Sequence, residues 1–230
     1  MITDNVPGKK GAPTFREASR RLAAAASQLY LHGWLLGTGG NLSAVTGENP
    51  LRVTISKSGI NKGQLDESGF LEINGSGDVI NGSGKPSAET QIHLSIINVL
   101  GCKSVIHTHS IPSTILSLEH LQDGNLTITG LEMLKGLENV STHKHIEIIP
   151  IIENSQDVLS LSKSVRDILE KNGSLHAILL SGHGLYTWGS TIDDTVRHVE
   201  ILEFLLEVIL RMGSINTRTS GMRIGAIMED

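Results

Sequence analysis

Two histidines, His107 and His109, stand two residues apart and directly follow the apolar pair Val105 and Ile106. In a β-strand, residues i and i+2 face the same side and lie roughly 6.5–7 Å apart along the chain. Both imidazoles can therefore converge on one ion between their tips. Zinc held by histidine, or by histidine and carboxylate, with one open position is the usual catalytic arrangement. The pair alone is also, and more commonly, explained by two partly buried histidines that are satisfied by hydrogen bonds.

A third metal ligand is best supplied by His183, which stands between Gly182 and Gly184 at the end of an apolar segment. Glycines let the backbone bend sharply and expose the ring to a cleft, although His183 could also be an ordinary turn histidine. Glu89 is the best candidate carboxylate, and we expect it in the first turn of a helix. The helix dipole favours an acid there in any case, but the same position could aim the carboxylate at a metal ion or a substrate hydroxyl. His93, one helical turn further on, could pair with Glu89, although a surface position is expected.

A glycine-rich loop at residues 37–43 and two short turns offer hydrogen-bond donors to a phosphate group. Successive backbone N–H groups in such loops form anion-binding concavities. The loop is not a dinucleotide fingerprint, because Leu42 stands where the last glycine is required and the loop follows a helix. Turn formation alone would also explain each segment. The candidate phosphate ligands are Gly40, Asn41, Ser43, Ser58, Gly59 and Ser87.

Glu132 is a further carboxylate that could act as general acid and base if it reached the metal site. It lies in the segment Gly130-Leu-Glu-Met133 and is one of 24 acidic residues. No spacing or periodicity distinguishes Glu132 from a solvated acid, so the residues by themselves assign it no role.

The elements that must position these side chains alternate between helices and strands. This alternation favours a layered α/β domain, and the consecutive short strands before residue 80 favour a mixed or largely antiparallel sheet. Helical periodicity, together with capping residues at several ends, predicts helices at 14–33, 86–100, from 112, 155–171 and 191–212. Apolar runs between turn residues predict strands at 42–46, 52–56, 70–73, around His107, and at 126–129, 146–152, 177–180 and 185–188.

The overall composition is that of an ordinary globular protein of 230 residues with a net charge of −5. No sustained basic run is present, so nucleic acid and anionic membranes are poor partners. No long apolar stretch or signal-like start is found, and the single cysteine, Cys102, excludes an intrachain disulfide and is expected to pack. We therefore expect a cytoplasmic protein with a flexible segment at 1–13, one catalytic domain at 14–212 and a polar tail at 213–230.

In their order and spacing, these motifs resemble the class II aldolase/adducin family over residues from about 15 to 210. The resemblance rests on the segments Gly40-Asn41-Leu42-Ser43, Lys57-Ser58-Gly59, Pro86-Ser87-Ala88-Glu89, His107-Thr108-His109 and Gly182-His183-Gly184. It implies a three-layer α/β/α fold with a central mixed, mostly antiparallel sheet. It also implies one Zn²⁺ per subunit bound by His107, His109 and His183, with Glu89 at the same site, and a homotetramer with sites at subunit interfaces.

Within the family, the segments Glu132-Met-Leu-Lys-Gly136, Thr142-His143 and 148–154 are most similar to the methylthioribulose-1-phosphate dehydratases of methionine salvage. That similarity implies a sugar-phosphate substrate, 5-methylthioribulose 1-phosphate, with Glu132 as general acid and base. The dehydratases vary at the position of Glu89, some carrying cysteine, so whether Glu89 touches metal or substrate stays open. An aldolase or epimerase acting on another sugar phosphate, or a non-catalytic adducin-like module, are the alternatives. His145 receives no role.

Overall fold

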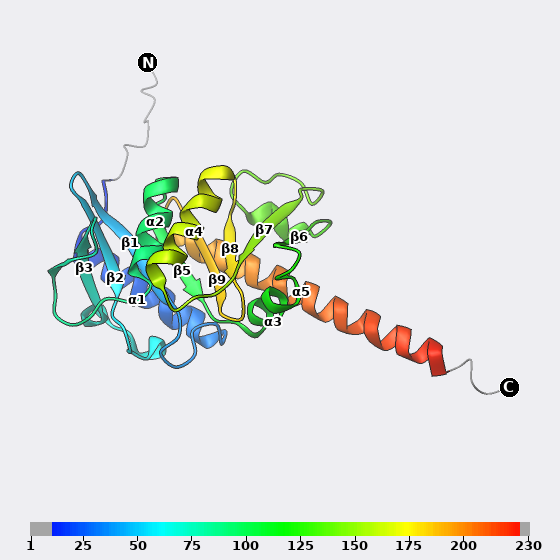
Figure 1. The fold of residues 1–230 in the computed structure, drawn as a ribbon. Coiled ribbons are helices and arrows are strands. Elements are labelled where there is room, and N and C mark those ends of the chain that lie inside the picture. Colours follow the sequence, from blue (N-terminus) through cyan, green and yellow to red (C-terminus); the bar gives the residue numbers. More distant parts are fainter. Residues whose placement is uncertain (1–10, 226–230) are drawn as a thin grey trace, which may run out of the picture.

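The computed structural model describes residues 11–225, and the surroundings of side chains up to residue 213. Its centre is a nine-stranded sheet in the order β4-β3-β2-β1-β5-β9-β8-β7-β6 (Figure 1). Within the described part of the chain, β7 and β8 are the one parallel pair, which confirms the predicted mixed, mostly antiparallel sheet. The strands are β1 Asn41–Glu48, β2 Leu51–Ser56, β3 Phe70–Asn74, β4 Val79–Asn81, β5 Ser104–Thr108, β6 Asn125–Ile128, β7 Glu147–Ile152, β8 Ala177–Leu180 and β9 Gly184–Gly189.

Helices cover both faces of this sheet and complete the predicted three layers (Figure 1). Helices α2 and α4 pack on one face, around a core that includes Val105 and Tyr186. Helices α1, α3 and α5 pack on the other face, where Ile106 is buried. The helices are α1 Phe15–Leu31, α2 Thr90–Leu100, α3 Ile111–Glu119, α4 Val158–Lys171 and α5 Ile192–Gly225, with 3-10 turns η1 Lys62–Gln64, η2 Glu67–Gly69 and η3 Glu132–Gly136.

Helix α1 illustrates how local sequence sets an element. The Thr14 hydroxyl accepts a hydrogen bond from the backbone N–H of Glu17, as the capping pattern predicts. Leu22, Ala26 and Leu29 recur at helical spacing and are fully buried. The apolar stripe therefore fixes α1 against β1 and the start of α5, in the third core cluster.

The boundaries of two helices differ from the sequence prediction, and one strand was not predicted. Helix α2 begins at Thr90 instead of near Pro86, because Pro86 pairs with Lys57 in a β-bridge and holds the preceding residues extended. Helix α5 continues to Gly225 instead of ending near Met212. Gly213 alone costs a helix only about 1 kcal/mol, which is too little to end it. Strand β4 was not predicted, since its three exposed residues carry no buried alternation. The division into a terminal segment, one domain and a tail stays a prediction.

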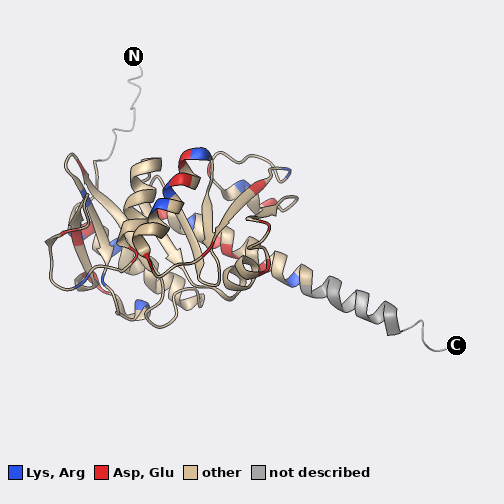
Figure 2. Cartoon of the chain, viewed as in Figure 1, with Lys and Arg blue, Asp and Glu red and all other residues tan. Residues whose placement is uncertain are grey.

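The middle of the sheet positions the candidate chemistry. Strand β5 lies between β1 and β9, with His107 opposite Asn41 on one side and Tyr186 on the other. Because side chains alternate along a strand, Val105 and His107 face the α2 layer while Ile106 faces α1 and α5. Among the described residues, no helix combines the length and apolar character that crossing a membrane requires. Lys, Arg, Asp and Glu are interspersed over the described chain (Figure 2).

Candidate metal centre and phosphate cavity

Three imidazoles meet beside the end of β5. The Nε2 atom of His107 lies 2.8 Å from Nε2 of His109 and 3.2 Å from Nε2 of His183. His107 is inside β5, His109 follows its last residue, and His183 comes from the turn between β8 and β9. The sequence prediction placed both members of the pair on one strand face; they converge, but His109 does so from just beyond the strand.

Two glycines bring His183 to this position. Gly182 has φ +63°, a left-handed conformation that L side chains rarely adopt. At Gly184 the backbones of β9 and β5 approach so closely that a Cβ would overlap the carbonyl oxygen of Thr108. The Gly-His-Gly segment therefore makes a tight turn that presses the His183 ring against the neighbouring strand.

His107 and His109 are held in the neutral form that binds a metal ion. His107 donates its Nδ1–H to the backbone carbonyl of Leu185 at 2.9 Å, so its Nε2 carries the free lone pair. Burial, and then the neighbouring His109 and His183, hold the pKa of His107 well below its usual value. Burial, followed by the charges of His183 and Lys62, lowers the pKa of His109 to about 4. Metal binding requires neutral imidazole, so no proton must be removed first near neutral pH.

The donor spacing fits a tetrahedral ion. Bonds of about 2.0–2.1 Å place neighbouring ligand atoms of a tetrahedral zinc site about 3.3–3.4 Å apart. The measured separations of 2.8 and 3.2 Å between the histidine Nε2 atoms are within about half an ångström of that value. The Glu89 carboxylate extends the set, with Oε1 3.3 Å from Nε2 of His183 and Oε2 3.6 Å from Nε2 of His107.

Glu89 is oriented by a chain of buried polar groups. It occupies the N-cap position of α2 without capping it, not the first turn as predicted. The Asn41 side-chain amide donates to Glu89 Oε2, and the Asn41 carbonyl oxygen accepts from His93 Nε2. The other ring nitrogen of His93 accepts from the Ser43 hydroxyl at 2.7 Å. His93 is therefore buried and not on the surface as predicted, and burial lowers its pKa to about 3.

A cavity of about 280 Å³ opens beside these ligands. It is lined by Glu89, His109 and His183, by five of the six predicted phosphate ligands, Gly40, Asn41, Ser58, Gly59 and Ser87, and by Thr38, Gly39, Lys57, Lys62 and Ala88. Gly40 has φ +70°, and a Cβ there would lie 2.6 Å from the His107 carbonyl oxygen. Only glycine fits where this loop crosses β5.

Ser43 is the predicted phosphate ligand that does not line the cavity. It is fully buried in β1, and its hydroxyl bonds to His93. Because side chains alternate along β1, Asn41 and Ser43 face the same way, but Ser43 lies one step deeper under α2. The geometry therefore gives Ser43 a positioning contact instead of a direct phosphate contact.

Two lysines of this cavity were not selected from the sequence as site residues. Lys62 is almost fully buried, and its Nζ donates to the carbonyl oxygens of Thr38 and Ile60 at 3.0 Å each. Burial lowers the pKa of Lys62, while the charge of Glu89 opposes this shift. Lys57 directly precedes Ser58. Both lysines border short glycine-containing turns. A lysine beside such a turn indicates anion binding only when several of these turns lie close together in the fold.

In the described part of the chain, Glu132 does not lie beside the three histidines. It lies at the start of η3 with its side chain 71% exposed, where it pairs with Lys135 at 2.6 Å and with His143 at 3.7 Å. It does not line the cavity that contains Glu89. The hydrogen bond from Lys135 is the largest cause of a lowered pKa at Glu132.

Comparisons with known proteins identify the family to which the chain belongs. The profile of the family described as "Class II Aldolase and Adducin N-terminal domain" matches residues 20–210. The methylthioribulose-1-phosphate dehydratase of Alcanivorax borkumensis is 38% identical over 197 residues, which cover 85% of this chain and 92% of that protein. The dehydratase of Pseudoalteromonas translucida is 40% identical over 173 residues, covering 75% and 80%.

Solved structures share the fold at low sequence identity. YgbL from Klebsiella pneumoniae has a TM-score of 0.74 at 21% identity, covering 88% of this chain and 92% of that one. The L-fuculose-1-phosphate aldolase of Thermus thermophilus has a TM-score of 0.69 at 22% identity, covering 86% and 95%. These likenesses confirm the class II aldolase-like architecture predicted from the motifs. With a family profile that spans most of its length and relatives of up to 40% identity, the chain belongs to the class II aldolase and adducin family.

Proposed function

We propose that this chain is a methylthioribulose-1-phosphate dehydratase of methionine salvage, a cytoplasmic hydro-lyase. It would convert 5-methylthioribulose 1-phosphate to 2,3-diketo-5-methylthiopentyl 1-phosphate. The observation that carries the proposal is the convergence of three histidines and Glu89 on a cavity lined by glycine- and serine-containing turns. Relatives that are 34–40% identical over most of the chain bear this name and support it.

The donor set suits one Zn²⁺ per subunit, held by His107, His109 and His183. When bound, the ion supplies Lewis-acid chemistry, which stabilises negative charge developing on the oxygen of the C2 carbonyl. Glu89 lies at ligand spacing from two of the histidines. The hydrogen bond from Asn41 fixes the Glu89 carboxylate in that place, so we assign Glu89 a direct contact with the ion or with substrate oxygens at it.

The turns at 38–41, 57–59 and 86–88 would hold the substrate phosphate. Ser58, Gly59 and Ser87 present hydroxyl and backbone donors, and the Lys57 ammonium adds a positive charge at the same cavity. Anchoring the phosphate places the reacting carbons at a fixed distance from the histidines. This positioning replaces a costly encounter with an intramolecular one.

Loss of water requires a group that removes the C3 proton and protonates the leaving C4 hydroxyl. We assign this role to Glu132, acting from a neighbouring subunit of a homotetramer. Its exposed position outside the cavity of its own chain supports that arrangement. Exposed apolar side chains lie on the same and adjoining elements: Met133 on η3, Ile111 and Leu118 on α3, and Phe204 on α5. An assembly would cover such a surface.

Mixed oligomers test the proposed sharing of the site. Glu132→Gln should lower kcat by about a hundredfold or more while leaving zinc bound, because a general acid-base group contributes about 10²–10⁴-fold. His109→Ala should lose the zinc of the three-histidine centre, and turnover with it. When the two inactive variants are co-assembled one to one, about a quarter of the sites in a cyclic tetramer combine His109 of one subunit with Glu132 of the next.

Restored dehydratase activity would support the shared site. The matched control pairs Glu132→Gln with a His109→Ala/Glu132→Gln double variant, which has no Glu132 to contribute. If mixed tetramers are shown to form but activity does not return in the first mixture, Glu132 does not act in the site of a neighbouring subunit. Unchanged turnover of Glu132→Gln would remove it from the mechanism.

A class II sugar-phosphate aldolase is the second candidate, favoured by the fold shared with L-fuculose-1-phosphate aldolase. Both reactions draw on the same metal and phosphate groups, so the products decide. The dehydratase releases water and gives the diketo phosphate. Cleavage of the C3–C4 bond of the same substrate would instead give an aldehyde and a three-carbon ketose phosphate, and their appearance would reverse the assignment. An intact three-histidine set argues against a non-catalytic module.

A further inference from the structure

A second cluster of potential metal ligands lies at the opposite end of β8 from the three-histidine centre. It consists of His145, which precedes β7, Glu147, the first residue of β7, and His176, which precedes β8. One ligand atom from each of them lies within 4.8 Å of the others. The three residues come from two chain segments about 30 positions apart, so only the parallel pairing of β7 with β8 brings them together.

Both histidines converge on one oxygen of Glu147. His145 Nε2 and His176 Nδ1 each lie 2.9 Å from Glu147 Oε2, and His176 Nδ1 lies 3.2 Å from Oε1. The side chain of Glu147 is only 3% exposed, and a buried carboxylate requires compensation by cations or hydrogen bonds. The spacing matches the 2.8–3.2 Å between the nitrogens of the three-histidine centre.

The His176 ring is fixed in the orientation of a metal ligand. Its Nε2–H donates to the backbone carbonyl of Glu138 at 2.9 Å, which turns Nδ1 toward Glu147. The Thr187 hydroxyl donates to the backbone carbonyl of His176 at 2.7 Å and anchors the residue. Metal-binding histidines characteristically donate their second ring nitrogen to a carbonyl or carboxylate in this way.

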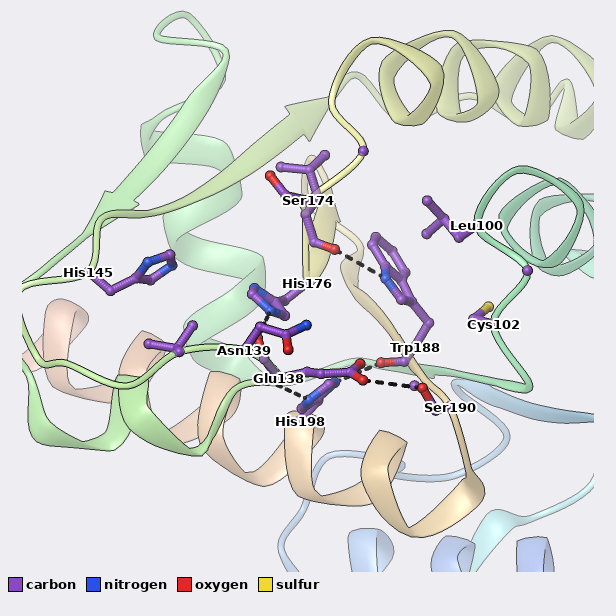
Figure 3. Close-up of a pocket in the computed structure, with 15 residues that line it drawn as sticks. Leu100, Cys102, Glu138, Asn139, His145, Ser174, His176, Trp188, Ser190 and His198 are labelled. Atoms are coloured by element: carbon purple, nitrogen blue, oxygen red, sulfur yellow. Dashed lines mark hydrogen bonds between the residues drawn. The ribbon is translucent and has the colours of Figure 1, made fainter. Parts of the chain in front are cut away.

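A cavity of about 430 Å³ lies beside the cluster and is bordered by its two histidines (Figure 3). His145 and His176 form part of its wall, together with Glu138, Trp188 and His198. His198 is already fully bonded, because its Nδ1–H donates to the Trp188 carbonyl and its Nε2 accepts from the backbone N–H of Glu138. The cavity side of the cluster can therefore supply water or a small ligand, but no further histidine.

We propose that His145, Glu147 and His176 form a second divalent-metal site of the two-histidine, one-carboxylate type, with an open position toward this cavity. Imidazole and carboxylate ligands suit Zn²⁺, and also Fe²⁺, Co²⁺ and Ni²⁺. Bound there, the ion joins the starts of β7 and β8. Through His176 and Glu138 it also supports the segment that follows η3, the turn carrying Glu132.

A metal-free alternative is a hydrogen-bonded triad in which a proton takes the place of the ion. Burial alone would lower the pKa of His176, but the hydrogen bond and charge of Glu147 outweigh it and raise the pKa. A protonated His176 paired with Glu147 would then neutralise the buried carboxylate. The two possibilities differ in one measurable property, the number of metal ions that the protein binds.

Zinc titration of the apoprotein against a chromophoric chelator tests the proposal. Wild-type protein should bind two Zn²⁺ per chain, and His109→Ala, which disables the first centre, should bind one. Adding His145→Ala to that variant should weaken the remaining site about tenfold or more, the scale of effect that even indirect contacts have on metal affinity. His145 is partly exposed and contributes little to the core, so its removal should leave the fold intact, as circular dichroism would check.

His120, which is partly exposed like His145 and pairs with Asp123, provides the matched control. His120→Ala in the His109→Ala background should still bind one Zn²⁺. Anomalous scattering at the zinc edge from zinc-soaked wild-type crystals should show a peak between His145, Glu147 and His176. If His145→Ala leaves the zinc stoichiometry and affinity of the His109→Ala protein unchanged, or if no such peak appears, the proposal is wrong.

Discussion

Asn41 is the side chain that joins the candidate metal centre to the interior of the fold. One end of its amide holds Glu89 and the other end holds His93, which in turn bonds to Ser43. Each end of the amide thus makes a buried contact, and Asn41 also lines the cavity. Ser43 and Ser58 are both predicted from sequence to bind phosphate, but only Ser58 lines the cavity.

Exchanging each serine for alanine should separate their roles. Ser58→Ala removes an exposed hydroxyl at the cavity, so KM for the sugar phosphate should rise several-fold with stability unchanged. Ser43→Ala leaves His93 Nδ1 buried without a partner, which should cost about 1–3 kcal/mol of unfolding free energy and leave KM nearly constant. Steady-state kinetics and urea denaturation of the two variants would check this. A large rise in KM for Ser43→Ala would instead indicate that Ser43 contacts the substrate phosphate.

Glu203 is a buried acid that contacts sequence neighbours of the candidate metal ligands, Thr108 and Ser110. It lies on α5, where the Thr108 hydroxyl between His107 and His109 donates to it. Burial is the largest cause that raises the pKa of Glu203 to about 7; the hydrogen bonds from Ser110 and Thr108 oppose this shift, and Glu207 adds to it. An acid with a raised pKa retains its proton in the folded state between pH 4.5 and 7, while the unfolded chain loses it.

The stabilising effect of Glu203 should consequently be lost as pH rises through this window. Glu203→Gln removes the ionisation, so its stability relative to the wild type should be greater at pH 8 than at pH 5, by up to about 3 kcal/mol. Denaturant unfolding at both pH values would measure the difference. The exposed Glu170 on α4, changed to Gln, should show no such dependence. An equal effect of Glu203→Gln at both pH values would contradict the raised pKa.

At the scale of elements, the tight turn between β8 and β9 is what brings the third histidine to the other two. Gly184 sits against the Thr108 carbonyl, where a Cβ has no space. Helix α2 positions a different ligand. Because the helix begins only at Thr90, Glu89 lies at its N-cap, from where the carboxylate reaches toward the histidines. Strand pairing and helix ends thus place the ligands more strictly than helix or strand propensity does.

Gly184→Ala should separate β9 from β5 and move His183 away from its partners. We expect a destabilisation of about 1–3 kcal/mol, the usual cost of forcing extra atoms into a packed site, together with weaker zinc binding. Gly173, where a Cβ would meet nothing within 4 Å, provides the control and should tolerate alanine. Thermal unfolding and zinc affinity of both variants would be compared. Unaltered zinc affinity in Gly184→Ala would show that the turn adapts without moving the ring.

At the scale of the whole molecule, the metal ion is expected to stabilise the fold because its ligands come from β5 and from the distant β8–β9 turn. A ligand present at a hundred times its Kd adds about 2.7 kcal/mol. For a chain of this size that corresponds to a fall in Tm of roughly 5–10 °C on chelation. Differential scanning calorimetry with and without EDTA would measure it. The fall in Tm should be smaller in His109→Ala. A wild-type Tm that does not change with EDTA would contradict a contribution of the metal ion to the stability of the fold.

The sequence by itself determined much of the site because its signals are local. The His-x-His spacing, the Gly-His-Gly turn and the glycine-rich loop each act within a few residues, so residue type and order were enough to select His107, His109, His183 and Gly40. Apolar periodicity likewise predicted most strands and helices, because an element that buries one face has apolar residues at regular, short spacings. Boundaries failed where long-range pairing overrode the local pattern, as at Pro86 and Lys57.

Only the tertiary structure decided which polar groups meet. Ser43 and His93 are 50 positions apart, and Glu147 and His176 are 29 apart. Their contacts depend on sheet order and register, which no local pattern encodes. The same holds for Glu132, whose sequence neighbourhood resembles a catalytic segment while the fold places it at the surface, away from its own metal centre. Residue types set the chemistry that the chain can perform; strand pairing and packing set which residues can perform it together.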